Sequence, residues 1–342
     1  MAGRHEKAGR VNQIRVGVIG LGYFGERHAR IYQALPNADL VAVCDRDLGR
    51  ASAVGARLGA VALTDYRALL ARSDIDAVSI CLPDRMHTEA AMAAAATGKA
   101  ILLEKPLAHD FVNAKQIAAA AELAGVRLMV GHILRFDPRY VQVHAASAPE
   151  VLGTPLTVCA RRYGIRATAT RLGGATSILF YMGVHDVDAM QWVARSRIAR
   201  VYAQKIERLG HGNEDALYAV VNFENGAIGL INYSWAWPDS LMNGYRAELE
   251  IVGTKSAAYL DCSNQGFYRI DDDRMTGGDT HLWPEINDRI VGDLADELAH
   301  FIDAVLNGKP FVQDWHEALD AIPVLDALAC SAAIGQPVTV ER

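Results

Sequence analysis

The chain has 342 residues, of which 51% are hydrophobic and 22% charged, and its formal net charge is −6. This length favours two domains, the composition supplies a large core, and the mixed charges offer no basic patch for nucleic acid or for an anionic membrane. The five cysteines are scattered, a spacing that fits neither a zinc site nor a disulfide framework and agrees with a reducing, cytoplasmic location.

The N-terminal region begins with a basic, polar tail and continues into a glycine-rich turn. Residues 1–13 lack the apolar stretch of a signal peptide, and no run of 18 apolar residues follows that could span a membrane. A β-rich run over 14–19 leads into a G-x-G-x-x-G pattern, and a helix is predicted over 26–35. Glycines in this context permit a tight turn, the approach of a pyrophosphate and close helix–strand packing. The predicted cofactor-binding residues of this turn are Gly20, Gly22, Tyr23, Phe24 and Gly25.

The second predicted strand, 40–44, ends at Asp45, which follows Gly25 by 20 residues. A carboxylate at this distance binds the adenosine ribose hydroxyls and repels a 2′-phosphate, so it favours NAD over NADP. Arg46 could stack on adenine or pair with a phosphate, which keeps NADP open, and Asp-Arg-Asp is also an ordinary turn and helix start. We predict that Asp45 and Arg46 bind the cofactor.

Strands and helices then alternate up to residue 130. The predicted helices are 47–58, 84–97 and 110–124, and the predicted strands are 77–82, 100–103 and 126–130. This alternation is typical of a parallel, doubly wound sheet. Leu82 and Pro83 end a strand on the cofactor side, and His87 lies one turn into the next helix, where it contacts the cofactor or makes local hydrogen bonds.

The apolar run 100–103 is followed by Glu104-Lys105-Pro106-Leu107. Ligands of open α/β sheets bind beyond the carboxyl ends of the strands, so this position places an ammonium group beside a cofactor or substrate. The alternative is a lysine at a solvated strand end. We predict that Glu104 and Lys105 bind the cofactor and that Lys105 also takes part in catalysis.

After Pro138 the pattern changes to consecutive β-rich stretches. They are 155–162, 200–206, 216–223, 227–237, 247–252 and 257–260, with the hairpin signal Asn225-Gly226 between two of them. Strands without intervening helices indicate an antiparallel sheet, one face of which can be left for a partner subunit. Two helices, 293–306 and 316–334, close the chain, and 271–284 reads as a lid or a long loop.

A further helix, predicted over 182–194, carries candidate catalytic residues of the second half. Tyr181, His185, Asp188 and Trp192 follow a spacing of i, i+4, i+7 and i+11, which predicts one shared face. His185 titrates near neutral pH and suits a general base, and Asp188 could fix its tautomer, cap the helix or form a salt bridge. The alternative is that the aromatic residues are core and His185 is structural.

Four features in this order, namely the glycine turn, Asp45, Glu-Lys-Pro-Leu and Gly183-Val184-His185-Asp186, resemble the Gfo/Idh/MocA family. The resemblance implies an N-terminal Rossmann domain with a doubly wound parallel sheet and a C-terminal α/β domain with a large, mainly antiparallel open sheet. Residues 131–138 resemble the segment between the two, which gives domains 14–137 and 138–342, with the last helix packing back on the first domain. It further implies a homodimer or homotetramer formed through the C-terminal sheet.

The resemblance also implies hydride exchange between NAD(P) and a carbinol of a sugar or cyclitol, without a metal. It assigns the role of the catalytic histidine to His185. The sequence departs from the family at Tyr181, where an aspartate is common. We expect Lys105 to polarise the reacting oxygen while His185 or Tyr181 exchanges its proton. These three residues, with Arg135, Tyr163 and Trp235, form the predicted substrate-binding set.

Two other functions stay open at this point. Some relatives resemble glycoside-cleaving enzymes that use NAD for a transient oxidation at C3, and the departure at Tyr181 also allows a dinucleotide-binding sensor without turnover. The variant Lys105→Ala separates them, since it should abolish either enzyme activity and leave a sensor's dinucleotide affinity intact.

Overall fold

The first half of the chain forms a six-stranded parallel sheet. The computed structural model describes residues 13–342 except 264–265, 273–274 and 314. The strands are β1 (Ile14–Ile19), β2 (Ala38–Cys44), β3 (Val61–Leu63), β4 (Ala77–Ile80), β5 (Ala100–Glu104) and β6 (Leu128–Gly131). Their order is β3-β2-β1-β4-β5-β6 and every pair is parallel, so the predicted doubly wound sheet is confirmed.

Helices alternate with these strands, and their ends follow simple capping rules. They are α1 (Tyr23–Ala34), α2 (Leu48–Leu58), α3 (Tyr66–Leu70), α4 (His87–Ala96) and α5 (Phe111–Ala124). Asp47 begins α2 by accepting a hydrogen bond from the Arg50 backbone N–H, and Asp110 begins α5 through the Asn113 N–H. Both helices end at a glycine with positive φ, Gly59 at 72° and Gly125 at 62°, where a side chain would be strained. The short β3 and α3 have weak patterns and were not among the predicted elements.

The second half forms a seven-stranded sheet in the order β12-β11-β7-β10-β9-β8-β17. Its strands are β7 (Pro155–Ile165), β8 (Ile198–Ile206), β9 (Ala216–Phe223), β10 (Ile228–Trp237), β11 (Tyr245–Gly253), β12 (Ala257–Asp261) and β17 (Val338–Thr339). Only β7 and β10 pair in parallel, so the predicted mainly antiparallel sheet is confirmed.

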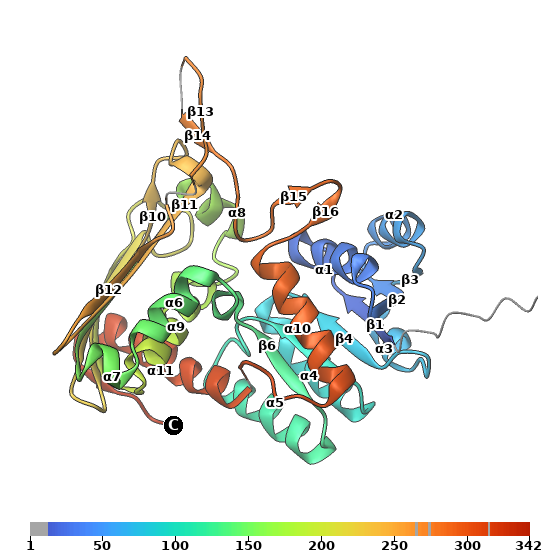
Figure 1. Cartoon of the computed structure of the whole chain (residues 1–342), viewed down its shortest axis with the longest axis horizontal. Helices are drawn as coiled ribbons and strands as arrows, with labels where there is room; N and C mark the ends of the chain where they lie inside the picture. The colour runs from blue at the N-terminus through green and yellow to red at the C-terminus, as the bar shows by residue number, and fades with distance from the viewer. Residues whose placement is uncertain (1–12, 264–265, 273–274, 314) are drawn as a thin grey trace, which may run out of the picture.

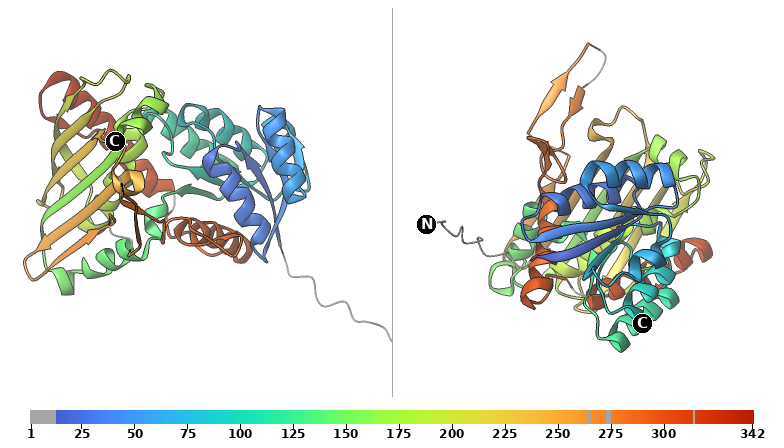
Figure 2. Two further views of the ribbon diagram at one scale, coloured as in Figure 1. Left: turned by 90° about the horizontal axis from the view of Figure 1, so that it is seen from above. Right: turned by 90° about the vertical axis from the view of Figure 1, so that its right-hand side faces the viewer.

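One face of this sheet is covered by helices, which Figure 1 shows lying between the two sheets. They are α6 (Pro138–Ala146), α9 (Val184–Ala194) and α11 (Trp315–Ile334), with the shorter α7 (Pro149–Leu152) and α8 (Arg166–Leu172) nearby. Among the described residues no helix covers the opposite face, as the view from above also shows (Figure 2). Large apolar side chains are exposed along its strands, namely Tyr202, Tyr218, Val220, Ile228 and Leu230.

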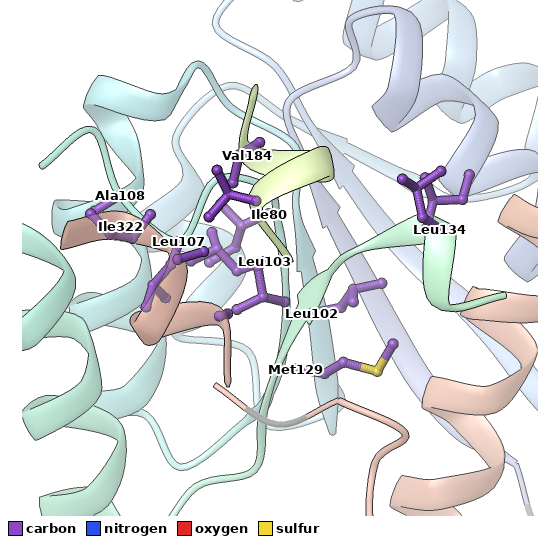
Figure 3. Packing of buried hydrophobic residues seen from close by; sticks show 14 of the residues in the cluster. Ile80, Leu102, Leu103, Leu107, Ala108, Met129, Leu134, Val184 and Ile322 are labelled. Atoms are coloured by element: carbon purple, nitrogen blue, oxygen red, sulfur yellow. The ribbon is translucent and has the colours of Figure 1, made fainter. Parts of the chain in front are cut away.

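Helix α11 joins the two halves, because it packs on α5 as well as on β8 and α9. The backbone N–H of Phe111, at the start of α5, donates to Asp326 Oδ2 of α11 at 2.9 Å. Figure 3 shows buried side chains from both halves where β5 ends, among them Leu107, Ile322 and Val184, each 0% exposed. One continuous core therefore fixes the end of β5 against the second half.

The remaining elements lie between β12 and α11. The hairpin of β13 (Tyr268–Ile270) and β14 (Met275–Gly277) projects from the molecule (Figure 1), and the hairpin of β15 (Glu285–Ile286) and β16 (Arg289–Ile290) reaches α1. Helix α10 (Asp293–Asn307) then packs against α1 and β1. In the described part of the chain, no helix has both the length and the apolar character needed to cross a membrane.

Candidate active site

The glycine turn between β1 and α1 has the geometry of a phosphate cradle. Gly20 has a φ of 86°, and a Cβ there would lie 2.6 Å from the Cys81 carbonyl oxygen. A Cβ at Gly25 would lie 1.7 Å from the Gly20 carbonyl oxygen, whereas one at Gly22 would meet nothing within 4 Å. The first and third glycines are therefore required by the fold, and the second leaves open space at the N-terminus of α1, where a pyrophosphate is favoured.

Asp45, at the end of β2, is tied to this turn. Its carboxylate accepts hydrogen bonds from the backbone N–H groups of Leu21 at 2.8 Å and Asp47 at 2.9 Å, and from Arg50 Nη1 at 3.2 Å. Burial opposes its charge, but these hydrogen bonds outweigh burial and lower the pKa of Asp45 below its ordinary value. An ionised carboxylate thus stands beside the turn, with Arg46 exposed next to it.

A cavity of about 440 Å³ opens between the two sheets, and we call it the central cavity. From the first half it is lined by Tyr23, Phe24, Glu104, Lys105 and Gly131. The segment between the halves adds Asp137, and the second half adds, among others, Arg139, Arg162, Tyr181, His185, Tyr245, Asp279, Trp283 and Glu297. Residues of the glycine turn, the Glu-Lys-Pro segment and the Gly-Val-His-Asp segment therefore share one space.

Lys105 crosses from the first half to the second. Its Nζ donates a hydrogen bond to the backbone carbonyl of Tyr181 at 2.9 Å and lies 4.9 Å from the centre of the Tyr181 ring. Burial lowers the pKa of Lys105 to about 8, against the opposing charge of Glu104. The group is mostly an ammonium at neutral pH, and it can donate to an oxygen in the cavity.

Glu104, next to it, faces away toward α1. Its Oε1 lies 3.1 Å from His28 Nε2, and His28 Nδ1 lies 3.2 Å from Ser79 Oγ, to which Tyr32 is also hydrogen-bonded. Burial opposes the charge of Glu104, but His28 and Lys105 outweigh it and lower the pKa of the carboxyl. This buried network fixes the strand end that carries Lys105, and the sequence analysis did not identify His28.

His185 lies at the cavity wall in the first turn of α9. Its Nδ1 is buried and has no hydrogen-bond partner among the described residues. Burial, and then the charges of Lys105 and Arg162, hold the pKa of His185 well below its ordinary value. The expectation of titration near neutral pH is therefore wrong in value, and the imidazole is neutral and able to accept a proton.

Tyr181 lies in a π-helical turn, Leu179–Gly183, that directly precedes α9. The wider π turn changes the register of this segment relative to a regular α-helix, yet Tyr181 and His185 both line the central cavity. The turn directs the Tyr181 carbonyl to Lys105, and the phenol oxygen lies 3.5 Å from Arg171 Nη2. The predicted shared face therefore holds for Tyr181 and His185, whereas Asp188 and Trp192 contact Arg135 outside the cavity.

Asp188 and Arg135 form a buried pair away from the cavity. Arg135 donates to the two Asp188 oxygens at 2.9 and 2.8 Å, and Gln313 Nε2 donates to the same carboxylate at 2.7 Å. The Arg135 guanidinium also covers the ring of Trp192, at 4.4 Å from its centre. Asp188 thus binds Arg135 and not His185, and Arg135, predicted as a substrate ligand, holds α9 in place.

Tyr163 and Trp235 also lie outside the central cavity. In β7 the side chains of Val158, Ala160 and Arg162 face the helices, so that of Tyr163 lies on the open face, where it stacks on Trp237 at 5.1 Å between ring centres. Trp235 follows the alternation of β10, in which Gly229, Ile231 and Tyr233 also face inward, and it is 0% exposed. A bulge between Ser234 and Trp237 turns Trp237 outward. Neither Tyr163 nor Trp235, both predicted to bind the substrate, therefore lines this cavity.

Arg162 takes the place that the sequence analysis gave to its neighbour. It lines the cavity, donates to Asp186 at 2.9 and 2.7 Å, and lies 3.2 Å from the hydroxyl of Tyr140. A buried arginine within a strand, with an aspartate next to His185 to pair with, is a signal that could have identified it.

Of the three residues after β4 that are predicted to contact the cofactor, Leu82 and Pro83 lie near the glycine turn, whereas His87 makes local hydrogen bonds. Leu82 packs against Gly20, and Pro83 is exposed next to it. His87 is buried, with its two ring nitrogens 2.8 Å from the carbonyl oxygens of Leu82 and Pro106, and burial lowers its pKa despite these hydrogen bonds. His87 therefore ties the turn after β4 to the segment that carries Lys105, which favours the local role over contact with the cofactor. The described residues contain no cluster of three metal-binding side chains.

Comparisons with known proteins agree with this geometry. Residues 14–132 match the model described as "Oxidoreductase family, NAD-binding Rossmann fold", and residues 140–259 match the Gfo/Idh/MocA C-terminal domain. The inositol 2-dehydrogenase of Rubrobacter xylanophilus is 28% identical over 96% of this chain and 94% of its own length. Inositol 2-dehydrogenase 4 of Saccharopolyspora erythraea is 36% identical over 55% of this chain and 56% of its own length.

A solved structure shares the whole architecture. GenD2 from gentamicin A biosynthesis, in complex with NAD, superposes with a TM-score of 0.84 at 27% identity, and each chain is covered completely. The two family models together span most of the chain, and the parallel and mainly antiparallel sheets described above are those that the resemblance implied. The chain therefore belongs to the Gfo/Idh/MocA family of NAD-binding oxidoreductases.

Proposed function

We propose that this oxidoreductase transfers a hydride between NAD and a ring carbinol of a cyclitol or a sugar, with Lys105 and His185 as its catalytic residues. The observation that carries the proposal is the central cavity, in which Tyr23 and Phe24 of the glycine turn face the same space as Lys105 and His185. The inositol 2-dehydrogenases among the relatives support a polyhydroxylated ring as the substrate.

The residues at the glycine turn fit the cofactor. The open space at Gly22 admits a pyrophosphate at the helix N-terminus, and the ionised Asp45 suits the ribose hydroxyls of NAD and repels the 2′-phosphate of NADP. When bound, NAD accepts or donates the hydride. This assignment keeps NAD as the cofactor and leaves NADP as the poorer alternative.

The protein's own groups handle the proton. A carbinol releases hydride only as its hydroxyl proton is removed, so the site needs a base and a donor to the oxygen. His185, neutral because of its lowered pKa, accepts the proton, and the Lys105 ammonium donates a hydrogen bond to the oxygen. Tyr181 holds Lys105 through its carbonyl, and its phenol is the second candidate for the proton exchange.

The test is absorbance at 340 nm with NAD⁺ or NADP⁺ and a panel of inositols, aldoses and uronic acids, together with keto-sugars and NADH for the reverse reaction. We expect turnover with NAD⁺ and at least one cyclitol or sugar, and a loss of about 10³-fold or more in kcat for Lys105→Ala and His185→Ala. Product from a glycoside without net NADH would instead identify cleavage through transient oxidation. Confirmed NAD binding with no reaction of any kind would favour a sensor.

We also propose that the protein is a homodimer or homotetramer formed through the open face of the seven-stranded sheet. The exposed apolar side chains on that face, Tyr218, Val220 and Leu230 among them, support this surface as the interface. Light scattering on the wild type and on Leu230→Glu tests it, since the charge should shift the protein toward monomer. An unchanged mass would exclude this face.

A cytoplasmic location is proposed on the state of the cysteines. All five, Cys44, Cys81, Cys159, Cys262 and Cys330, are free thiols, as is usual in a reducing compartment. Fractionation of the producing cell would test it.

A further inference from the structure

Glu297, on α10, is a buried acid that the proposed mechanism does not use. Its side chain is 0% exposed, it lines the central cavity, and neither of its carboxyl oxygens has a hydrogen-bond partner among the described residues. A buried polar group without a partner is costly, so such a group at a cavity wall points to a ligand that completes it.

The groups around Glu297 come from four elements. Glu104 lies at the end of β5, Asp293 one turn earlier on α10, Tyr32 on α1 and Cys81 just after β4. None of these four is a cation, and His28, also on α1, is already paired with Glu104 at 3.1 Å. Burial first, and then the charges of Glu104 and Asp293, raise the pKa of Glu297 well above its ordinary value, so the free protein holds it as a neutral acid.

The cations that line the same cavity already have partners. Lys105 is hydrogen-bonded to the Tyr181 carbonyl at 2.9 Å, Arg139 is paired with Asp137 at 2.6 Å, and Arg162 is paired with Asp186 at 2.7 Å. The end of the cavity near the glycine turn thus holds the Glu297 acid without a partner, beside the Glu104 carboxylate, which is paired with His28. A cationic group of a ligand would complete this end of the site.

Oxidised nicotinamide is such a group, because its ring carries a positive charge that the reduced ring lacks. We propose that Glu297 is a cofactor-binding residue that releases its proton to solvent when the oxidised nicotinamide binds, so that the site favours NAD⁺ over NADH. The inference rests on the proposed placement of the nicotinamide beside Lys105, in the cavity that Tyr23, Phe24 and Glu297 share. Binding of NAD⁺ then depends on pH, and binding of NADH does not depend on this group.

The experiment is isothermal titration calorimetry of NAD⁺ and of NADH at pH 7, in two buffers that differ in ionisation enthalpy. The variants are Glu297→Gln, which keeps the shape but cannot ionise, and Asp296→Asn, which removes an exposed acid of the same helix as a matched control. Lys105 is a second group that can lose a proton to the nicotinamide charge, so the informative quantity is the difference between the wild type and Glu297→Gln.

We expect the wild type and Asp296→Asn to release more protons on binding NAD⁺ than Glu297→Gln does. We also expect Glu297→Gln to weaken NAD⁺ binding about tenfold, which corresponds to about 1.4 kcal/mol, with NADH affinity unchanged. Equal proton release in Glu297→Gln and wild type, or an equal effect of the variant on both cofactors, would overturn the inference.

A measurement on the wild type alone guards against a variant that folds poorly. The ratio of the NADH and NAD⁺ dissociation constants should rise with pH between 6 and 8, and a ratio that stays flat would also overturn the inference. If the wild type binds neither cofactor, the proposed function itself fails, which is a different outcome from a failure of this inference.

Discussion

The two walls of the central cavity are built by different means. The first-half wall, which includes Tyr23 and Lys105, is positioned by backbone sterics and strand ends: the glycine turn before Tyr23 has no room for a Cβ at Gly20 or Gly25, and Lys105 follows the end of β5. On the second-half wall, the side chains depend on strand parity and helix register, which the π turn before α9 and the bulge in β10 both shift. Positions fixed by the backbone can be recognised from a sequence motif. Side-chain positions in the second half depend on a π turn and a β-bulge, which each add one residue and have no sequence motif.

The largest expected effects come from the glycine turn, where two neighbouring glycines should separate folding from binding. Gly25→Ala places a methyl group 1.7 Å from the Gly20 carbonyl oxygen, so we expect a loss of about 3 kcal/mol or more of the free energy of unfolding. Gly22→Ala meets no atom within 4 Å, so the fold should keep its stability while NAD⁺ affinity falls about tenfold or more, since the methyl enters the phosphate space. Urea unfolding and calorimetry measure the two quantities. Equal stability of both variants would contradict the steric reading of the turn.

The next effect tests the parity of β7, where adjacent arginines lie on opposite faces. Arg162→Met leaves the fully buried Asp186 without its partner, which we expect to cost about 3–5 kcal/mol of the free energy of unfolding. Arg161→Met removes a half-exposed guanidinium paired with Glu248, and we expect about 1 kcal/mol or less. Urea unfolding of both variants gives the comparison. A larger loss for Arg161→Met would mean that the strand is placed one residue out of register.

The same contrast separates what the sequence predicts correctly from what it does not. The fold followed from the alternation of elements and from the hairpin signal, and the first wall followed from spacing alone. The sequence predicts Tyr163 as a substrate ligand, but its neighbour Arg162 lines the cavity, because adjacent side chains of a strand lie on opposite faces and only the packed sheet settles which face is inside. Tyr181 lies beside Lys105 as predicted, whereas Trp235 is packed in the core and Arg135 is held in a buried ion pair. Glu297 lies on a helix that carries no motif, and His28 lies beyond the glycine motif on α1, so only the packing shows that they belong to the site.

The smallest expected effect joins the two walls, since each contributes one titrating group to the proposed reaction. His185 must be neutral to accept the proton, and because its pKa is well below its ordinary value, kcat/KM for oxidation should fall only at pH values below about 6.5. Lys105 must be protonated to donate. Its pKa is about 8, and the oxidised nicotinamide lowers it further, so activity should also fall as the pH rises, with an alkaline midpoint at pH 8 or below. Each limb should approach a tenfold loss per pH unit, measured as kcat/KM from pH 5 to 10. Lys105→Arg should move the alkaline limb upward, because the guanidinium stays charged, while leaving the acid limb in place. If the alkaline limb does not move in Lys105→Arg, the limb belongs to a different group, and Tyr181 is the first candidate. The groups that exchange protons would then both lie in the second half of the chain.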